Sequence, residues 1–284
     1  MTVKDFIHYN AIYMHMKNWL NKSLKLVSDK LRFLVDTGEY ITLIGDTIKA
    51  VLSRPPSISL IMNQLYDIGV ASLPVVAITG FSTGLVLAAQ SFYQLADKGL
   101  VSVTGLMVAK AMMTELGPVL TAFMITGRVG ASMCAELGTM RVTEQLDALK
   151  TMSINPNRYL IAPRMFAGTI MMPLLTIFSI IMGILGGYLI SIYFFGMAPA
   201  TYFDPMPTHI TTFDLFTGIF KAFIFGSLIM TIACYKGLKT EGGAAGVGRS
   251  TTNSVVITYC CILLSNFLLT ILLNILRGEI DKLI

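Results

Sequence analysis

Three long stretches without a single charged residue constrain the fold of this chain more than any other feature. They are Ile68–Ala96, Met165–Pro199 and Ser250–Leu276. A helix needs about 20 mainly apolar residues to cross the hydrocarbon layer of a membrane, where every backbone N–H and C=O group must be bonded within the segment. We therefore expect each stretch to form a membrane-spanning helix.

Two further stretches are apolar but carry isolated charges: Val103–Leu137, and Phe213–Tyr235, which holds Asp214 and Lys221. Only 13% of the residues are charged and 54% are hydrophobic, whereas a soluble domain carries about 25% charged residues. The sequence thus predicts an all-α integral membrane protein. Its five spans are expected at about 66–96, 103–137, 163–196, 213–236 and 250–276.

The first part of the chain, residues 1–56, differs in kind from the rest. Between Lys17 and Phe33, basic residues alternate with apolar ones at helical spacing. A helix with one basic and one apolar face tends to lie in the membrane interface, and the pair Pro55 and Pro56 ends such a helix. We expect a basic amphipathic interfacial helix in 1–56 and a transmembrane domain in 57–284, with a short cytoplasmic helix between its second and third spans.

The distribution of Lys and Arg among short loops predicts the orientation. The N-terminal region, the connector before the third span and the loop before the last span are basic, whereas Gly196–Thr212 contains no Lys or Arg. The N-terminus is therefore expected in the cytoplasm and the C-terminus outside. Arg277 and Lys282 fit this orientation less well, although Glu279 and Asp281 offset them.

Ionisable residues at membrane depth usually face a protein interior, a partner or a water-filled path. Glu115, Arg128 and Glu136 of the second span are therefore candidate functional groups. Gly183 and Gly187 have the spacing of closely packed helices, either within the chain or between subunits.

The polar connector after Leu137 contains a short amphipathic pattern. We expect Gly138 to end the span and Thr143 to cap a new helix, in which Val142, Leu146 and Leu149 share one side. Such a helix can offer its carboxylates to a partner protein. The pattern is equally typical of a solvated surface turn. After the connector, Arg158 and Arg164 are expected to reach lipid phosphates.

The sequence offers little support for catalysis. Gly243–Ser250 fits the phosphate-loop pattern except that Arg249 replaces the lysine, but it lies between two spans and follows no strand. We expect Arg249 and Ser250 to cap the last span instead. Cys134, Cys234, Cys260 and Cys261 match neither a zinc site nor a disulfide framework.

Four segments together resemble the MlaE family of ABC permeases, the membrane subunits of MCE-type lipid transporters. They are Glu115-Leu-Gly-Pro-Val-Leu-Thr, Gly127-Arg-Val-Gly-Ala, Ala135-Glu-Leu-Gly-Thr-Met-Arg-Val-Thr-Glu-Gln-Leu-Asp-Ala-Leu and Pro163-Arg-Met-Phe-Ala-Gly. The resemblance implies a non-catalytic permease in the bacterial inner membrane, which forms a homodimer and moves phospholipid. It also implies two cytoplasmic ATPase subunits that bind ATP and Mg, and an extracytoplasmic MCE-domain protein. No cofactor in this chain and no nucleic acid are expected.

The same resemblance implies roles for individual residues. It implies that Glu115 is a polar group near the outer end of a lipid cavity. Arg128 and Glu136 are then motif residues towards the inner side of that cavity. Some relatives carry a basic residue where this chain has Thr114. The expected ATPase contacts are Arg141, Thr143, Glu144, Gln145, Asp147 and Leu149. The candidates for the rest of the lipid path are Leu85, Leu87, Phe92, Tyr93, Ile262 and Leu269.

Two alternatives come from other functional classes. An ion-coupled secondary transporter would use Glu115, Arg128 and Asp214 as a charge relay, but such transporters usually contain paired repeats. The sequence shows no internal repeat, and five spans do not divide into two equal halves. The other alternative is a structural membrane scaffold, which would bind no lipid substrate.

Overall fold

The computed structural model describes residues 35, 37–49 and 57–283. The chain divides into two compact units between Asp46 and Thr47. The described residues of the first unit are helical. The basic pattern of the predicted interfacial helix, from Lys17 to Phe33, lies outside the described residues, so that helix stays a prediction.

The second unit contains five helical stretches that are long and apolar enough to cross a membrane, and no strand occurs in the described parts of the chain. This confirms the predicted all-α fold. The stretches are Ile58–Ala96, Val101–Val142, Asn157–Tyr193, Thr212–Leu238 and Gly243–Glu279. Most of them extend beyond the predicted spans, because polar residues continue the helices past the apolar segments.

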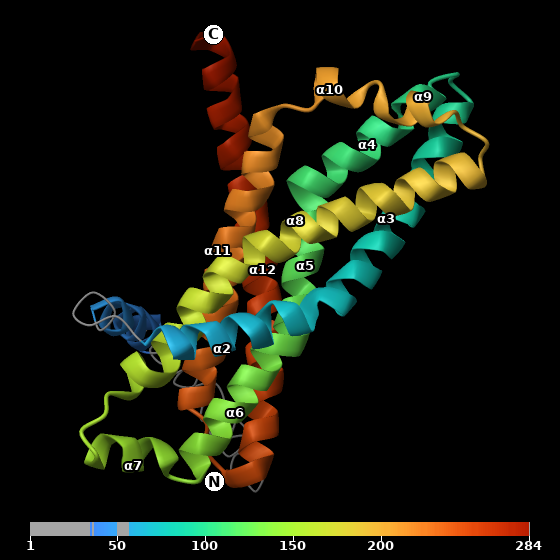
Figure 1. The fold of residues 1–284 in the computed structure, drawn as a ribbon. Helices are drawn as coiled ribbons and strands as arrows, with labels where there is room; N and C mark the ends of the chain where they lie inside the picture. Colours follow the sequence, from blue (N-terminus) through green and yellow to red (C-terminus); the bar gives the residue numbers. More distant parts are fainter. Residues whose placement is uncertain (1–34, 36, 50–56, 284) are drawn as a thin grey trace, which may run out of the picture. The chain divides into compact units, whose positions relative to one another are not determined.

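The first stretch changes direction at Gly69. It consists of α2 (Ile58–Ile68), the 3₁₀ turn η1 (Val70–Ser72) and α3 (Leu73–Ala96), and Figure 1 shows α2 and α3 running in different directions. A Cβ atom at Gly69 would lie 2.5 Å from Cε of Met171. The bend therefore packs against the flexible side chain of Met171 in the third stretch, which would have to move to admit a larger residue.

The second stretch is divided by two π-helical turns. After η2 (Val101–Val103) come α4 (Thr104–Ala111), the π-turn η3 (Met112–Leu116), α5 (Gly117–Ile125), the π-turn η4 (Thr126–Gly130) and α6 (Ala131–Val142). Glu115 lies in the first π-turn and Arg128 in the second. Isolated π-turns within α-helices are frequent at functional sites.

Gly138 does not end the second stretch, because α6 continues to Val142. Instead, Gly138 allows a close contact between helices: a Cβ atom there would lie 2.9 Å from Oγ1 of Thr240. The prediction of a helix end at Gly138 is therefore wrong.

The remaining helices follow in order. The third stretch begins with the π-turn η5 (Asn157–Ile161) and continues as α8 (Ala162–Tyr193). Two short helices follow, α9 (Pro199–Phe203) and α10 (Met206–His209). The chain then forms α11 (Thr212–Leu238) and α12 (Gly243–Leu283). Because α12 starts at Gly243, Arg249 and Ser250 lie inside a helix, and their predicted role as its cap is wrong. The segment that resembles a phosphate loop is itself helical.

The core of the second unit forms where α8 packs between α3 and α11 (Figure 1). A Cβ atom at Gly84 of α3 would overlap the backbone carbonyl of Gly183 in α8, only 1.8 Å from its oxygen. A Cβ atom at Gly187 would lie 2.6 Å from the Tyr202 hydroxyl. Both glycines of the predicted motif therefore serve packing within the chain.

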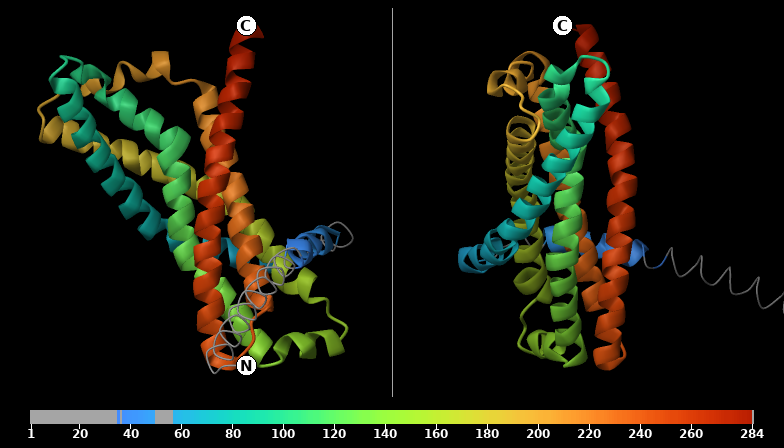
Figure 2. Two further views of the ribbon diagram at one scale, coloured as in Figure 1. Left: turned by 180° about the vertical axis from the view of Figure 1, so that it is seen from behind. Right: turned by 90° about the vertical axis from the view of Figure 1, so that its right-hand side faces the viewer.

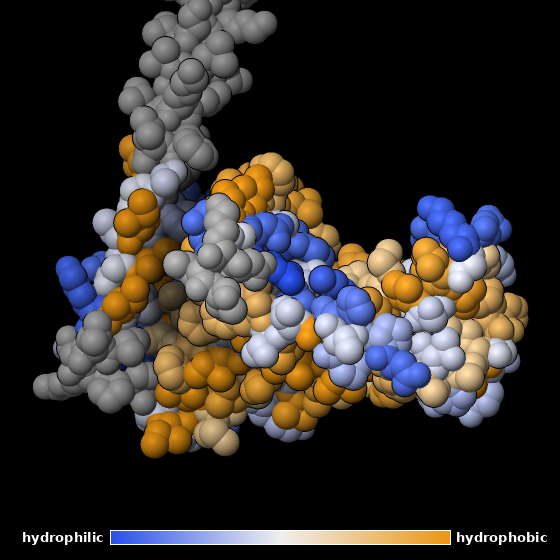
Figure 3. Space-filling model, turned by 90° about the horizontal axis from the view of Figure 1, so that it is seen from above, coloured by the Kyte–Doolittle hydropathy of each residue, from blue (hydrophilic) through white to orange (hydrophobic). Residues whose placement is uncertain are grey.

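The last helix, α12, runs alongside α11 (Figure 2). It exposes most of its apolar surface. Within its most apolar segment 11% of the residues are buried, against 56% for α11. The exposed apolar side chains include Leu263, Leu264, Phe267, Leu268, Ile271 and Leu272. Apolar residues also cover much of the flanks in the end-on view of Figure 3, as expected for surfaces that face lipid or another apolar partner.

Candidate functional site

A buried polar cluster joins the second, fourth and fifth stretches. Nζ of Lys221 in α11 lies 2.7 Å from Oε1 of Glu115 in η3. The same ammonium group donates to the Thr114 carbonyl at 3.0 Å and to Oγ1 of Thr270 in α12 at 2.8 Å. From α12, Nδ2 of Asn266 donates to the other carboxylate oxygen at 3.0 Å. The cluster therefore fixes three helices to one another through hydrogen bonds.

The geometry explains how a lysine can lie in an apolar span. The Lys221 side chain has no exposed surface, and an unpaired charge there would be strongly unfavourable. An ammonium group has three N–H donors, and Glu115, Thr114 and Thr270 supply three acceptors. Glu115 is a candidate functional group by sequence alone, whereas Lys221 stands in the sequence as an isolated charge. The only sequence signal for the pair was one acidic and one basic residue in two different spans.

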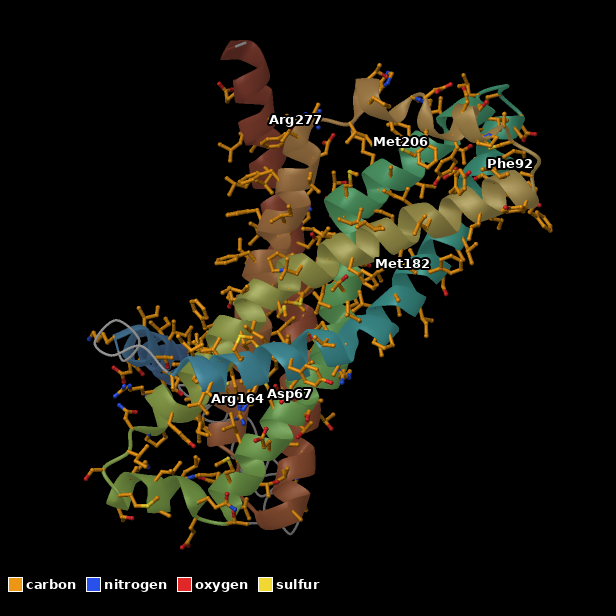
Figure 4. The ribbon with its side chains drawn as sticks, in the orientation of Figure 1. Asp67, Phe92, Arg164, Met182, Met206 and Arg277 are labelled. Atoms are coloured by element: carbon orange, nitrogen blue, oxygen red, sulfur yellow. The ribbon has the colours of Figure 1, made fainter. Side chains whose placement is uncertain are left out.

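A second ion pair lies near the start of α11. Oδ1 of Asp214 accepts a hydrogen bond from Nη1 of Arg277 in α12 at 2.9 Å, and the aspartate side chain is 2% exposed. Oδ2 of Asp214 accepts from the backbone N–H of Thr211 at 3.0 Å, which completes a capping box at the helix start. Figure 4 shows Arg277 on α12 beside the start of α11.

The two ion pairs line one cavity of about 150 Å³. Glu115, Lys221, Asp214 and Arg277 contribute to its wall, together with Lys110 of α4. No ion pair or side-chain hydrogen bond of Lys110 is found among the described residues. The wall therefore carries three cationic and two anionic side chains, a balance that suits an anionic group such as a phosphate. We call this cavity the cationic cavity.

Arg128 belongs to a different site. Nη1 of Arg128 donates a hydrogen bond to Oγ of Ser72 in η1. Within the described part of the chain, no hydrogen bond or ion pair connects Arg128 with Glu115 or Asp214. The three members of the alternative charge relay are thus not brought together, and a secondary transporter is not favoured.

Glu136 pairs with Arg164 at the start of α8. Nη2 of Arg164 lies 2.7 Å from Oε1 of Glu136, and the arginine side chain is 4% exposed. Figure 4 labels Arg164 where α8 begins. The prediction that Arg164 reaches lipid phosphates is therefore wrong, because its side chain turns into the protein and pairs with the second stretch.

The connector forms a helix, α7 (Gln145–Thr151), which lies at the end of the second unit opposite to the C-terminus (Figure 1). Leu146 is buried and anchors it, while Leu149 is half-buried. Thr143 does not cap this helix: its hydroxyl donates to the Thr139 carbonyl, and the N-cap position is taken by Glu144 in a left-handed conformation at φ +59°. A structured helix, rather than a solvated turn, therefore follows the second stretch.

The exposed surface of α7 carries a small charge network. Asp147 lies 3.2 Å from Arg141 and 3.0 Å from Lys150. The hydrogen bond and positive charge of Lys150, reinforced by Arg141, lower the pKa of the Asp147 carboxyl group. Thr143, Glu144 and Gln145 are exposed. The expected ATPase contacts therefore lie together around one short helix.

The apolar candidates for the lipid path are spread over the unit. Leu85 and Leu87 are half-buried on α3, and Phe92 stacks on Phe195 with ring centroids 4.0 Å apart. Tyr93 is 63% exposed. On α12, Leu269 packs at the edge of the core. Ile262 is fully buried in the core and presents no surface to a lipid in this conformation.

Comparison with known proteins places these features in a family. Residues 61–272 match the family model Permease MlaE. A protein of Rickettsia conorii named "Probable ABC transporter permease protein" is 41% identical over 240 residues, which cover 84% of this chain and 93% of the relative. The "Intermembrane phospholipid transport system permease protein MlaE" of Haemophilus influenzae is 35% identical over 212 residues, 74% of this chain and 81% of the relative. This chain belongs to the MlaE family of ABC transporter permeases.

Proposed function

We propose that this chain is the membrane subunit of an ATP-driven transporter that moves phospholipid between the inner membrane and an extracytoplasmic MCE-domain protein. Membership in a permease family supports this proposal, as does the Haemophilus relative, whose name assigns it to intermembrane phospholipid transport. Five apolar helical stretches, each long enough to cross a membrane, make up most of the chain.

The observation that carries the proposal is the cationic cavity beside an apolar helix. The wall carries one more cationic than anionic side chain, and this excess positive charge attracts a phosphate group. The same helix that supplies Arg277 exposes a long apolar surface. Acyl chains gain about 0.8 kcal/mol for each methylene group removed from water. One amphipathic substrate can therefore satisfy both surfaces.

The energy for transport would come from partner subunits. We assign the binding of ATP and Mg to two cytoplasmic ATPase subunits, which contact α7 through Thr143, Glu144, Gln145 and Leu149. The ion pair between Arg141 and Asp147 stabilises the conformation of this contact surface. Buried Leu146 fixes α7 to the membrane unit, so that a movement of the ATPase is passed on to α6.

The complete assembly requires further copies and partners. We infer a homodimer, in which the exposed apolar surface of α12 faces either the second copy or the lipid between the two copies. The side of the membrane with α7 is assigned to the cytoplasm, and the C-terminal end of α12 to the outside. Apolar residues Leu85, Leu87, Phe92, Tyr93 and Leu269 remain proposed contacts of the acyl chains.

A reconstituted assay tests the proposal. The permease, its ATPase and its MCE partner would be placed in vesicles that contain fluorescent phospholipid, and transfer to a separate acceptor would be followed. We expect transfer with ATP and none with a hydrolysis-deficient ATPase. Transfer that continued without ATP and stopped when the proton gradient was collapsed would instead support the ion-coupled transporter.

A further inference from the structure

A second polar cavity, of about 300 Å³, lies where α2 passes the second π-turn and α6. The proposed function leaves this cavity without a role. Its polar wall consists of Gln64, Asp67, Arg128, Ser132 and Glu136. Ile68, Ala71, Val129 and Met133 complete the lining and make part of it apolar. Figure 4 labels Asp67 on α2, near the crossing with the second stretch.

Arg128 is held in place as the cation of this cavity. Its Nη1 donates to Oγ of Ser72, and the Ser72 hydroxyl in turn donates to the Ile68 carbonyl at 2.6 Å. Ser72 is fully buried, so this anchor is rigid. Among the described residues Arg128 has this one neutral hydrogen-bond partner, which leaves its other N–H donors available for an anion.

The carboxylates of the cavity are not equivalent. Glu136 is already paired with Arg164. No ion pair or hydrogen bond of the Asp67 side chain is found among the described residues, and this side chain lines the same cavity as Arg128. The cavity therefore offers one cationic and one anionic group that are not paired with each other.

We propose that this cavity binds the zwitterionic headgroup of an aminophospholipid, with the phosphate on Arg128 and the ammonium group on Asp67. This inference rests on the proposed function and adds a second headgroup site, different in charge from the cationic cavity. A purely anionic headgroup would meet the unpaired carboxylate of Asp67 here, and like charges disfavour binding. A headgroup that carries both charges matches both unpaired groups.

The surroundings of the cavity favour a lipid over a soluble phosphoamine. Ile68, Ala71, Val129 and Met133 form the apolar part of its lining, in the same cavity as the charged groups. These side chains give the first methylene groups of the acyl chains an apolar surface next to the headgroup. A small soluble compound would gain nothing from these side chains.

The test measures headgroup preference rather than transport alone. The complex would be purified in nanodiscs with equal amounts of phosphatidylethanolamine and phosphatidylglycerol, and the bound lipids would be quantified by mass spectrometry. We expect Asp67→Asn to lower the ratio of bound phosphatidylethanolamine to phosphatidylglycerol about threefold, the effect of losing one partly exposed charge pair. Asp97→Asn, at an exposed carboxylate just after α3, is the matched control and should leave the ratio unchanged.

Variants of Arg128 provide an independent test of the same cavity. Arg128→Gln should reduce binding of both lipids at this site, whereas Arg128→Lys, which keeps the charge, should restore most of it. Free phosphoethanolamine should not displace bound lipid, and displacement would assign the cavity to a soluble compound and overturn the lipid site. An unchanged lipid ratio in a folded Asp67→Asn complex would also overturn it.

The failure of this inference can be distinguished from the failure of the proposed function. If the wild-type complex transfers lipid with ATP but Asp67→Asn keeps the wild-type preference, the second headgroup site is wrong and the transporter assignment stands. If the wild-type complex transfers neither phosphatidylethanolamine nor phosphatidylglycerol with ATP, the proposed function fails, and the headgroup site fails with it.

Discussion

Lys221 and Glu115 form an ion pair of 2.7 Å whose two members differ sharply in exposure: the lysine side chain is fully buried, whereas the glutamate side chain is 37% exposed. The exposed carboxylate faces the cationic cavity, and the buried ammonium group holds it there. The glutamate can therefore meet a substrate while its partner positions it.

This asymmetry predicts unequal effects of single substitutions. Glu115→Gln leaves a buried ammonium group without its counter-ion, whereas Lys221→Met leaves a carboxylate that water can still reach. We expect Glu115→Gln to lower the free energy of unfolding by about 2 kcal/mol and Lys221→Met by less. Thermal unfolding in detergent measures both effects. The double variant completes a double-mutant cycle, which gives the coupling energy between the two side chains. Additive effects of the two substitutions would show that the pair contributes no coupling energy.

The contact between α3 and α8 predicts strong sensitivity at Gly84. Gly84→Ala would place a Cβ atom 1.8 Å from the Gly183 carbonyl oxygen, so the helices must separate, at a cost of about 3 kcal/mol. Gly248→Ala in α12 is the control, because nothing lies within 4 Å of the added atom. That control should be neutral or slightly stabilising. Melting temperatures of the two purified variants check the prediction, and equal values would contradict it.

The surface of α7 predicts where the ATPase can be uncoupled without damage to the permease. Glu144→Lys reverses an exposed charge, and Leu149→Asp places a carboxylate on a half-buried position. We expect both to reduce ATPase binding at least tenfold, a loss of about 1.4 kcal/mol, while insertion into the membrane continues. Co-purification with the ATPase and the rate of ATP hydrolysis are the measurements.

The control for this experiment is Asp97→Lys, which reverses an exposed charge far along the chain from α7. It should bind the ATPase normally. Complexes of Glu144→Lys and Leu149→Asp that assembled and hydrolysed ATP like the wild type would show that α7 is not the contact.

The capping box at the start of α11 predicts a stabilising role for Asp214. Asp214→Ala removes both the acceptor for the Thr211 N–H group and a carboxylate that pairs with Arg277. We expect the free energy of unfolding to fall by about 2 kcal/mol. Asp204→Ala, at an exposed carboxylate after α9, should change it by less than about 0.5 kcal/mol. Chemical unfolding of the two variants compares them directly, and similar losses would exclude a specific role of the cap.

The sequence predicted the features that depend on local composition. Uninterrupted apolar stretches such as Met165–Pro199 have no stable alternative to a membrane helix, so five spans could be assigned in advance. The period of Leu146 and Leu149 pointed to a helix in the connector, and α7 forms there. Helix ends were predicted poorly: α6 continues past Gly138, where close packing outweighs local preference, and α12 begins at Gly243 rather than near Ser250.

The polar cluster was beyond local reasoning. Glu115 and Lys221 lie 106 positions apart, and either could have paired with any opposite charge in the membrane. The partner of Arg164 could not be predicted either. Its position at the edge of a span suggested contact with lipid, but its side chain is buried and pairs with Glu136. In both cases the partner is determined by how the spans pack, which no single segment encodes.

The two π-turns of the second stretch have a consequence for how this helix can change in evolution. Each π-turn accommodates about one residue more than the α-helical repeat and rotates the next helical segment by about 100°. Glu115 and Arg128 therefore occupy faces that a continuous α-helix of this sequence would not give them. Deletion of one residue in η3 would return this turn to the α-helical repeat and leave α5 and α6 on their present faces. The two π-turns are therefore the points of the second stretch where the loss of one codon would keep the packing of the span, whereas the same loss within an α-helical segment would turn every following residue by about 100°.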